Sequence, residues 1–194
     1  MTWKDEKKEL AERIRQILKE KGSVSVGIDG RCASGKTTLG KELQEVLGGT
    51  LIHMDDFFLR PEQRTKERYA EPGGNVDRER FEKEVLIPLQ EGRTFSYRPF
   101  DCQTMTLKDP VMAEENRIVI VEGSYCLHPD LRDFYDLKVF LDVDPVTQMK
   151  RIERRNPDKI GMFRNRWIPY EETYFKAFHV RECCDVVLNT ENAF

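Results

Sequence analysis

The chain has 194 residues and carries 32 lysines and arginines against 35 aspartates and glutamates, which gives a formal net charge of -3. This length suits one domain with a sizeable core, so we expect residues 1–194 to form a single unit, and the near balance of charge gives no reason to expect nucleic acid or a membrane as a partner. The odd number of five cysteines, the missing C-x-x-C pair and the charged N-terminus favour reduced thiols in the cytoplasm. The three histidines are far apart and lack metal-ligand spacing, which argues against a zinc site.

Helices and strands are predicted to alternate along the chain. Leu10, Ile14 and Ile17 place apolar side chains on one helical face. The continuous apolar run 118–121 is typical of a strand that is covered on both faces. In chain order, the predicted elements are a helix up to Gly22, strand 24–28, helix 36–47, strand 51–54, helix 78–90, strand 118–121, strand 139–141, a helix from Pro145, helix 171–181 and strand 186–188. This order predicts an α/β domain with a parallel sheet of about five strands.

Residues Gly30 to Thr37 fit the pattern G-x-x-x-x-G-K-[ST] of a phosphate-binding loop, or P-loop. Such a loop points its backbone N–H groups at a polyphosphate, and the helix that follows directs its positive dipole end to the same place. Lys36 would reach the β- and γ-phosphates, and the Thr37 hydroxyl would help to hold Mg²⁺. We therefore expect the chain to bind a nucleoside triphosphate, with ATP and Mg²⁺ as cofactors. The predicted contact residues are Gly30, Arg31, Cys32, Ala33, Ser34, Gly35, Lys36, Thr37 and Thr38.

Carboxylates follow two of the other predicted strands. Asp55 and Asp56 come directly after strand 51–54, and Glu122 directly follows the run 118–121. Because ligands of open α/β sheets bind beyond the carboxyl ends of the strands, we expect these acids to lie around the γ-phosphate. The candidate Mg²⁺ ligands are therefore Thr37, Glu122 and Asp55.

The acidic pair also bears on the nature of the phosphate acceptor. A carboxylate can accept or orient the proton of an attacking hydroxyl, whereas two acids would repel an acceptor that is itself a phosphate. A hydroxyl acceptor is therefore favoured, with Asp55 as the candidate base. On an extended backbone Asp55 and Asp56 would point in opposite directions, so we expect only one of them to be catalytic.

A basic segment, residues 150–166, follows the helix that is predicted to begin at Pro145. Within it, Arg151 and Arg155 share one helical face at i,i+4 spacing. Arginines that close over a transferring phosphoryl group neutralise its charge and exclude water, so both are catalytic candidates in a lid of roughly residues 150–168. The alternative interpretation is a solvated basic helix.

Two long irregular stretches interrupt the pattern of elements. Residues 60–76 are polar and rich in charge, Pro and Gly, and residues 92–115 include Phe100 and Asp101. Long loops in a compact domain are usually functional or disordered, and we expect acceptor specificity to lie in these two. The sequence alone identifies neither the acceptor nor the oligomeric state, and it leaves a homo-oligomer open.

Taken in order, these motifs resemble the uridine kinase and phosphoribulokinase family of P-loop kinases. The phosphate loop, the segment His53-Met54-Asp55-Asp56-Phe57-Phe58 and the segment Val121-Glu122-Gly123 are similar to motifs of that family. The Asp-Asp-Phe-Phe run is as close to the nicotinamide riboside kinases. The resemblance implies a three-layer P-loop fold with five parallel strands, a catalytic base at Asp55 and a nucleoside as the small-molecule acceptor.

The resemblance also implies acceptor contacts. The segment Asn75-Val76-Asp77 is similar to one whose Asp holds ribose hydroxyls, which gives that role to Asp77. Where uridine kinases recognise the pyrimidine with a Tyr-Asp pair and a nearby His, this chain has Phe100 and Asp101 and no His. A base could stack on Phe100, but no polar readout of uracil is visible. A kinase of a small hydroxyl compound is therefore predicted ahead of a uridine kinase.

Two other classes of protein stay open at this point. A nucleotide-binding switch of the GTPase type usually carries an N-K-x-D segment, and the chain has none. A nucleoside monophosphate kinase needs a cationic acceptor pocket, for which Arg60, Arg64 and Arg68 are candidates, although Asp55 argues against it.

Overall fold

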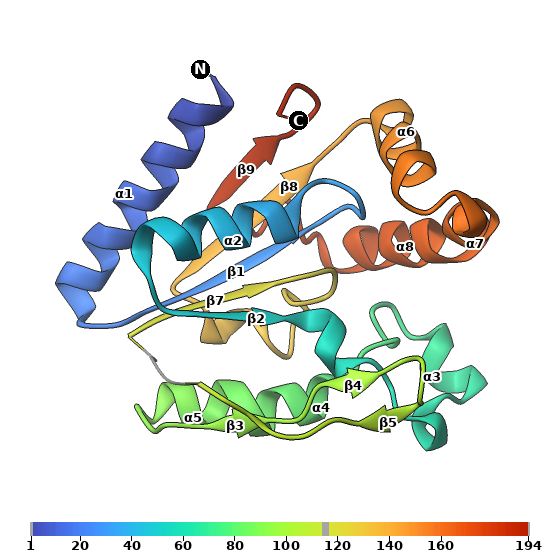
Figure 1. Cartoon of the computed structure of the whole chain (residues 1–194), viewed down its shortest axis with the longest axis horizontal. Coiled ribbons are helices and arrows are strands. Elements are labelled where there is room, and N and C mark those ends of the chain that lie inside the picture. The colour runs from blue at the N-terminus through green and yellow to red at the C-terminus, as the bar shows by residue number, and fades with distance from the viewer. Residues whose placement is uncertain (1, 114–116, 194) are drawn as a thin grey trace.

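A computed structural model describes residues 2–113 and 117–193, and a five-stranded sheet in the order β2-β7-β1-β8-β9 forms its centre (Figure 1). All pairings within this sheet are parallel. The strands are β1 (Val24–Gly30), β2 (Thr50–His53), β7 (Ile118–Glu122), β8 (Leu137–Asp142) and β9 (Val186–Asn189). The predicted parallel sheet is confirmed.

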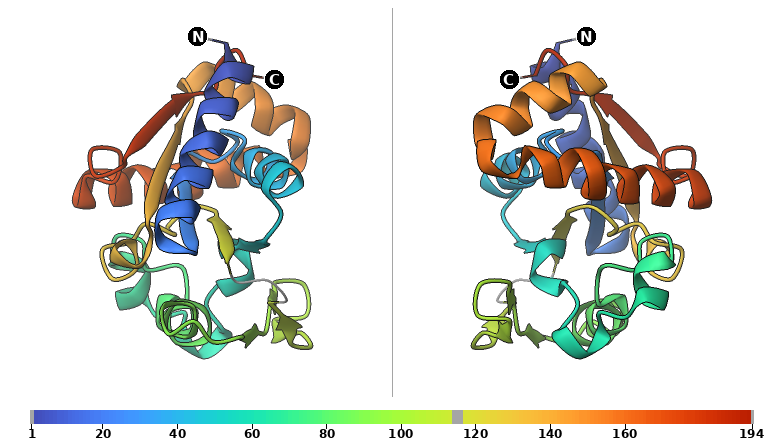
Figure 2. Two further views of the ribbon diagram at one scale, coloured as in Figure 1. Left: turned by 90° about the vertical axis from the view of Figure 1, so that its left-hand side faces the viewer. Right: turned by 90° about the vertical axis from the view of Figure 1, so that its right-hand side faces the viewer.

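Helices and helical segments cover both faces of the sheet. On one face lie α1 (Trp3–Lys21) and α2 (Lys36–Leu47), whose apolar residues pack against alternate residues of β1, β7 and β8. Figure 2 shows these two helices side by side. On the other face, α8 (Ile168–Phe178) and the segment 125–135 pack against the remaining alternate residues, among them Val119 and Phe140. The three-layer architecture is therefore present.

The register of the sheet aligns the carboxyl ends of three strands. Glu122, the last residue of β7, pairs with Ile28 of β1 on one side and with His53, the last residue of β2, on the other. Loops that leave these strands consequently start at the same edge of the sheet. This alignment brings the phosphate loop, Glu122 and the acidic pair together.

The predicted helix 78–90 is a continuous helical segment with a wider turn in its middle. It consists of α4 (Arg78–Phe81), a π-helical turn (Glu82–Leu86) and α5 (Ile87–Gln90), which contains Pro88. Proline lacks an N–H, and its ring collides with the carbonyl group four residues earlier in a regular α-helix. The wider turn before Pro88 relieves that collision.

The two stretches predicted to be irregular contain short elements. Residues 60–76 include a 3-10 turn (Pro61–Gln63) and α3 (Lys66–Ala70). In the second stretch, short antiparallel pairs join β3 with β6 and β4 with β5, while residues 114–116 lie outside the described part. These strands are β3 (Ser96–Tyr97), β4 (Phe100–Asp101), β5 (Thr106–Leu107) and β6 (Val111–Met112). Sequence periodicity could not reveal strands of two residues.

The segment predicted as a lid is helical. It begins in α6 (Pro145–Arg155), and its later parts are a 3-10 turn (Pro157–Lys159), α7 (Ile160–Met162) and a π-helical turn (Phe163–Trp167) that leads directly into α8. A further 3-10 turn, Arg132–Phe134, precedes β8. Among the described residues, no helix is both long and apolar enough to span a membrane.

We expect Gly123→Ala to destabilise the protein by about 2–4 kcal/mol. Gly123 has a φ of 137°, and a Cβ there would lie 2.7 Å from Cβ of Met54, the residue before Asp55. Urea unfolding would measure the loss. Gly22→Ala is the matched control, because Gly22 also has a positive φ but no heavy atom within 4 Å of the added Cβ, and it should cost about 1 kcal/mol. Equal losses in the two variants would contradict the steric explanation.

Candidate active site

The loop between β1 and α2 wraps around the ammonium group of Lys36. Lys36 Nζ donates hydrogen bonds to the carbonyl oxygens of Gly30 at 2.6 Å and Arg31 at 2.9 Å, and the side chain is buried. Gly30 and Gly35 have φ angles of 136° and 98°, which glycine adopts without the steric penalty of a Cβ. The glycines of the pattern thus permit the turn that brings the lysine back over the start of its own loop.

The loop and the start of α2 fit a polyphosphate. No side chain caps this helix start, and the first N–H groups of a helix, here those of Lys36 and Thr37, have no partner within it. Ser34 Oγ is buried and has no hydrogen-bond partner among residues 2–113 and 117–193. Unpaired donors at the positive end of a helix dipole, beside a buried ammonium group, are suited to phosphate oxygens. The predicted contacts Ala33 and Thr38 belong to the same loop and first turn.

Glu122 is a shared acceptor at the carboxyl end of β7. Its Oε1 accepts a hydrogen bond from the Thr37 hydroxyl at 3.0 Å and lies 2.6 Å from His53 Nδ1. The hydrogen bond to Glu122 raises the pKa of His53 above 6.5, although partial burial acts in the opposite direction. Two of the three predicted metal ligands, Thr37 and Glu122, are therefore in direct contact.

The oxygen atoms of Thr37 and Glu122 suit Mg²⁺ only as part of a larger shell. In the described part of the chain, no three His, Cys, Asp or Glu side chains are grouped so that they could hold a metal ion. Mg²⁺ commonly uses one or two protein oxygens and completes its octahedron with phosphate oxygens and water. A magnesium ion at this place would therefore depend on a bound nucleotide.

Asp55 and Asp56 lie in a 3-10 turn, Met54–Phe57, and the assumption of an extended backbone here is wrong. Successive side chains of such a turn are about 120° apart, so the two carboxyl groups still point to different surroundings. Asp55 is accessible to solvent, but desolvation by the surrounding protein and the negative charge of Glu122 raise its pKa, while Lys36 lowers it. Asp56 instead accepts a hydrogen bond from the Tyr97 hydroxyl at 3.5 Å. Asp55 is thus the member of the pair whose pKa responds to the charges of Glu122 and Lys36.

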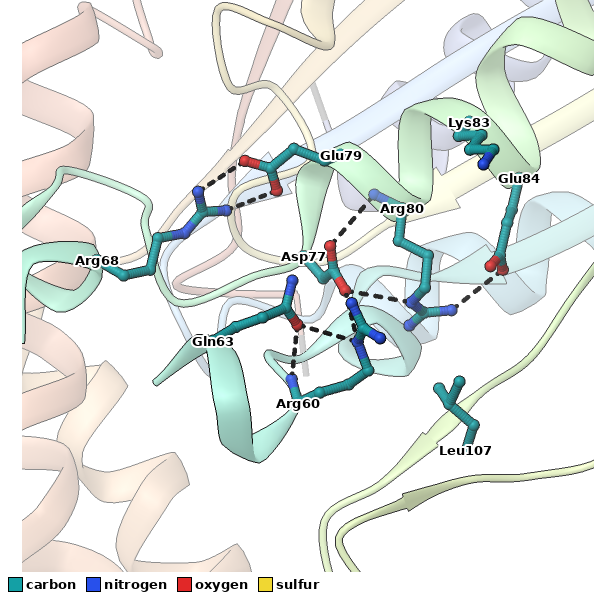
Figure 3. A pocket seen from close by; sticks show the side chains of 9 residues that line it. All are labelled: Arg60, Gln63, Arg68, Asp77, Glu79, Arg80, Lys83, Glu84 and Leu107. Atoms are coloured by element: carbon teal, nitrogen blue, oxygen red, sulfur yellow. Dashed lines mark hydrogen bonds and ion pairs between the residues drawn. The ribbon is translucent and has the colours of Figure 1, made fainter. Parts of the chain in front are cut away.

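Asp77 lines a cavity of about 550 Å³ near the 60–76 segment and α4 (Figure 3). Its Oδ1 accepts the backbone N–H of Arg80 at 3.2 Å and so caps α4. Its Oδ2 lies 3.5 Å from both Arg60 Nε and Arg80 Nε, is buried, and has no hydrogen-bond partner among the described residues. The Asp77 N–H donates to the carbonyl oxygen of Phe57 at 2.7 Å, which joins this residue to the turn that carries Asp55.

Phe100 and Asp101 make contacts around their own hairpin. The guanidinium carbon of Arg64 lies 5.6 Å from the centre of the Phe100 ring, which is 5% exposed. The Asp101 carboxylate accepts the N–H of Gln103 at 2.7 Å, and this hydrogen bond lowers its pKa. A base that stacked on Phe100 would have to share the ring with Arg64.

The two predicted lid arginines of α6 have different surroundings. Arg151 Nη1 donates to the carbonyl oxygen of Ala33 at 3.3 Å and to Thr190 Oγ1 at 3.2 Å, which ties α6 to the phosphate loop and to the chain after β9. Arg155 Nε donates to Asn156 Oδ1 at 2.9 Å. Within the described residues, the structure brings Arg151 to the phosphate loop but gives Arg155 no hydrogen bond there.

Sequence reasoning gave no role to Asp29, a buried acid within β1. One of its carboxylate oxygens accepts the N–H groups of Gly30 at 2.7 Å and Tyr125 at 3.3 Å. The other accepts the N–H of Leu127 at 3.1 Å and the hydroxyl of Tyr174 at 2.8 Å. Burial raises the pKa of Asp29 to about 6, although Lys36 and these hydrogen bonds act against the shift. An acid inside an otherwise uncharged strand was the signal that could have identified it.

Sequence reasoning also missed two adjacent glutamates of α8. The Glu171 carboxylate accepts the N–H of Cys32 at 2.9 Å and, through its other oxygen, the hydroxyl of Ser124. Glu172 binds Arg31 through Nε at 2.7 Å. An acidic pair in a helix usually faces solvent, so the sequence held no signal for this contact with a loop some 140 residues away.

The sequence is similar to known proteins of one family. A model of the Phosphoribulokinase / Uridine kinase family matches residues 25–159. The chain is 27% identical over 176 residues to a uridine kinase of Ligilactobacillus salivarius (strain UCC118), which covers 83% of this chain and 80% of the relative. It is 30% identical over 155 residues to a uridine kinase of Lactococcus lactis subsp. cremoris (strain MG1363), which covers 73% of this chain and 72% of the relative.

The fold is also found among solved structures. A structure described as a possible uridine kinase from Bacillus stearothermophilus has a TM-score of 0.64 and 24% sequence identity, and the match covers 93% of this chain and 99% of that one. At this identity the likeness concerns the fold alone.

The contact between His53 and Glu122 predicts a measurable titration. In NMR titrations we expect His53 to titrate above 6.5 in the wild type and to return toward that value in Glu122→Gln. Because the folded-state pKa is raised, the pair stabilises the fold below the unfolded-state pKa, and this contribution is lost as pH rises through the folded-state pKa. His128, whose pKa burial lowers to about 4, is the internal control and should titrate alike in both proteins. An unchanged His53 midpoint in the variant would contradict the assignment.

Proposed function

Because the chain belongs to the phosphoribulokinase / uridine kinase family, we propose that it transfers the γ-phosphate of ATP to a hydroxyl group of a nucleoside-like small molecule. The relatives named uridine kinase support a nucleoside as the acceptor class. The sequence resemblance sets Phe100 against a Tyr of uridine kinases, so the proposal leaves the base of that nucleoside unspecified.

The observation that carries this proposal is the position of Asp55. Its carboxyl group lies within electrostatic reach of both Lys36, which the phosphate loop surrounds, and Glu122, which contacts Thr37. A group that takes a proton from an attacking hydroxyl must stand at the γ-phosphate end of the nucleotide site, and its raised pKa makes it a better proton acceptor. The charges of Lys36 and Glu122 near Asp55 and its raised pKa support it as that group.

The other residues of the site have roles that follow from their donors and acceptors. When bound, Mg·ATP supplies the phosphoryl group and the metal charge that offsets the developing negative charge. Lys36 and the N–H groups at the start of α2 would hold the phosphates, and Thr37 and Glu122 would contribute to the metal shell. Arg151 would support the loop through its contact with Ala33.

The acceptor is proposed to bind beside Asp77. A buried carboxylate oxygen without a hydrogen-bond donor is costly, and the hydroxyl groups of a sugar are donors of the right kind. Asp77 Oδ2 is such an atom, and it lies at a cavity large enough for a nucleoside. The link from the Asp77 N–H to the carbonyl oxygen of Phe57 fixes this residue relative to the Asp55 turn.

The ion pairs of two arginines at this cavity, Arg68 and Arg80, favour a neutral acceptor over a nucleoside monophosphate. Arg68 makes paired hydrogen bonds with Glu79 at 2.7 and 2.8 Å, and Arg80 binds Glu84 at 3.1 Å. Carboxylates therefore already neutralise these guanidinium groups. An acceptor phosphate would have to compete with them for each positive charge.

A test of the reaction is ATP-dependent ADP release in the presence of a panel of nucleosides, with the matching monophosphates as a second panel. At least one nucleoside should stimulate ADP release, and the monophosphates should not. Asp55→Asn should lower kcat by about 10²–10⁴-fold while the protein still binds ATP, because the proton acceptor is lost.

Asp56→Asn is the matched control for Asp55→Asn. It removes a neighbouring carboxylate that faces Tyr97, so we expect kcat to fall by less than about tenfold. Equal losses in the two variants would show that Asp55 is not the base. Stimulation by monophosphates alone would contradict the hydroxyl of a nucleoside as acceptor.

For Asp77→Asn we expect the KM of the stimulating nucleoside to rise by about tenfold or more, while the KM of ATP stays unchanged. The amide removes the negative charge that would bind the sugar hydroxyls, but asparagine still caps a helix well, so α4 should persist. Steady-state kinetics with each substrate varied in turn would measure both constants. A rise in the KM of ATP alone would place Asp77 outside the acceptor site.

A further inference from the structure

We propose that Glu171 holds the phosphate loop in the nucleotide-free protein and must release it when a γ-phosphate arrives, so that ATP, but not ADP, moves α8 and the lid. This inference rests on the proposed binding of ATP. It does not depend on the identity of the acceptor.

Glu171 contacts the peptide unit between Arg31 and Cys32. The carbonyl oxygen of this unit accepts Lys36 Nζ at 2.9 Å, and its N–H donates to Glu171 at 2.9 Å. In a P-loop, the lysine reaches the β- and γ-phosphates, so this peptide unit lies near the γ end of the loop. The Glu171 carboxylate therefore accepts the Cys32 N–H, a backbone donor that lies where the terminal phosphate would approach.

Glu171 is built into this position. It is 4% exposed, and its second oxygen accepts the hydroxyl of Ser124, two residues after Glu122. A buried carboxylate is tolerated when hydrogen bonds satisfy both of its oxygens. In the described structure these two donors meet that requirement, which makes the contact a defined latch between α8 and the loop.

The charges around the loop favour release of Glu171 by a γ-phosphate. The loop's own arginine, Arg31, is already bound by Glu172 and by Asp142, so its charge is not available to offset Glu171. A terminal phosphate would add negative charge beside Glu171 in a poorly hydrated place, where repulsion is strong. ADP lacks that group and can leave the latch closed.

Movement of Glu171 would be transmitted toward the N-terminal end of α8, because the other end is anchored. Toward the C-terminal end, Tyr174 donates a hydrogen bond to Asp29 and anchors the helix. Toward the N-terminal end, Tyr170 stacks on Tyr69 with 6.4 Å between the ring centres. The guanidinium carbon of Arg166 lies 5.2 Å from the centre of the Tyr69 ring. The released half of α8 therefore connects the loop with both the lid and the acceptor-side segment 60–76.

The first test compares binding of ADP and of a non-hydrolysable ATP analogue by calorimetry. In Glu171→Gln we expect the analogue to bind at least about fivefold more tightly, with ADP changed by less than about twofold, because one negative charge at the γ end is gone. Glu172→Gln is the matched control, since Glu172 binds the Arg31 side chain and not a loop N–H, and it should shift both nucleotides by the same factor.

The outcomes separate this inference from the proposed function. A parallel shift of both nucleotides in Glu171→Gln, or weaker binding of the analogue, would overturn the latch and leave the kinase proposal standing. Failure of the wild type to bind either nucleotide would overturn both.

A second test leaves Glu171 intact. The chain has two tryptophans, and Trp167 lies in the turn that leads into α8 while Trp3 lies in α1. In a Trp3→Phe background, the ATP analogue should change the Trp167 emission and ADP should not. The same change with both nucleotides would show that α8 does not respond to the γ-phosphate, and would overturn the proposal.

Discussion

The buried carboxylate of Asp29 is the interaction on which the arrangement of this site depends. It sits at the end of β1 and accepts four hydrogen bonds, from the first residue of the phosphate loop, from two residues after β7 and from α8. A buried carboxylate is stable only when its oxygens are paired, and here the four bonds tie three separate segments to the same point. Removal of this group would leave three backbone N–H groups and a hydroxyl in the core to find other partners.

Near Asp29, the site contains two carboxylates and one ammonium group. The carboxylates of Asp55 and Glu122 stand at the aligned ends of β2 and β7, and Lys36 reaches over the start of its loop. Desolvation by the surrounding protein, followed by the negative charge of Glu122, raises the pKa of Asp55, while Lys36 acts in the opposite direction. Such a carboxyl group is suited to proton transfer, which supports the proposed attack by a hydroxyl.

The proposed acceptor side, around Asp77, consists of short elements that side-chain contacts hold together. Arg80 donates to the carbonyl oxygens of Asp56 and Arg98 and lies over the ring of Phe57, so it joins the acidic turn, α4 and the hairpin. Its charge is therefore used to support the structure. Asp77 Oδ2 lies 3.5 Å from two arginines but accepts no hydrogen bond among the described residues, and we propose it as the acceptor for a ligand hydroxyl on this side.

The sequence by itself determined the sheet, the order of its elements and the phosphate loop. Apolar runs such as 118–121 and the pattern from Gly30 to Thr37 are local signals, since strand burial and loop geometry depend on neighbouring residues. It also placed Asp55 and Glu122 together, because parallel strands end at the same edge of a sheet. For that reason the core of the site was predictable, although the backbone at Asp55 and Asp56 is a tight turn where we assumed an extended strand.

Only the tertiary structure decided which residues hold the loop and which face the acceptor. The contacts of Glu171 with Cys32 and of Arg64 with Phe100 join segments whose spacing carries no periodic signal. The same applies to Asp29, whose partners come from three separate segments, and to Arg151 and Arg155, which share a helical face but not the same surroundings. Such contacts follow from packing between distant parts of the chain. The helix period determines on which face of its helix a side chain lies, but it does not determine which other segment that face contacts.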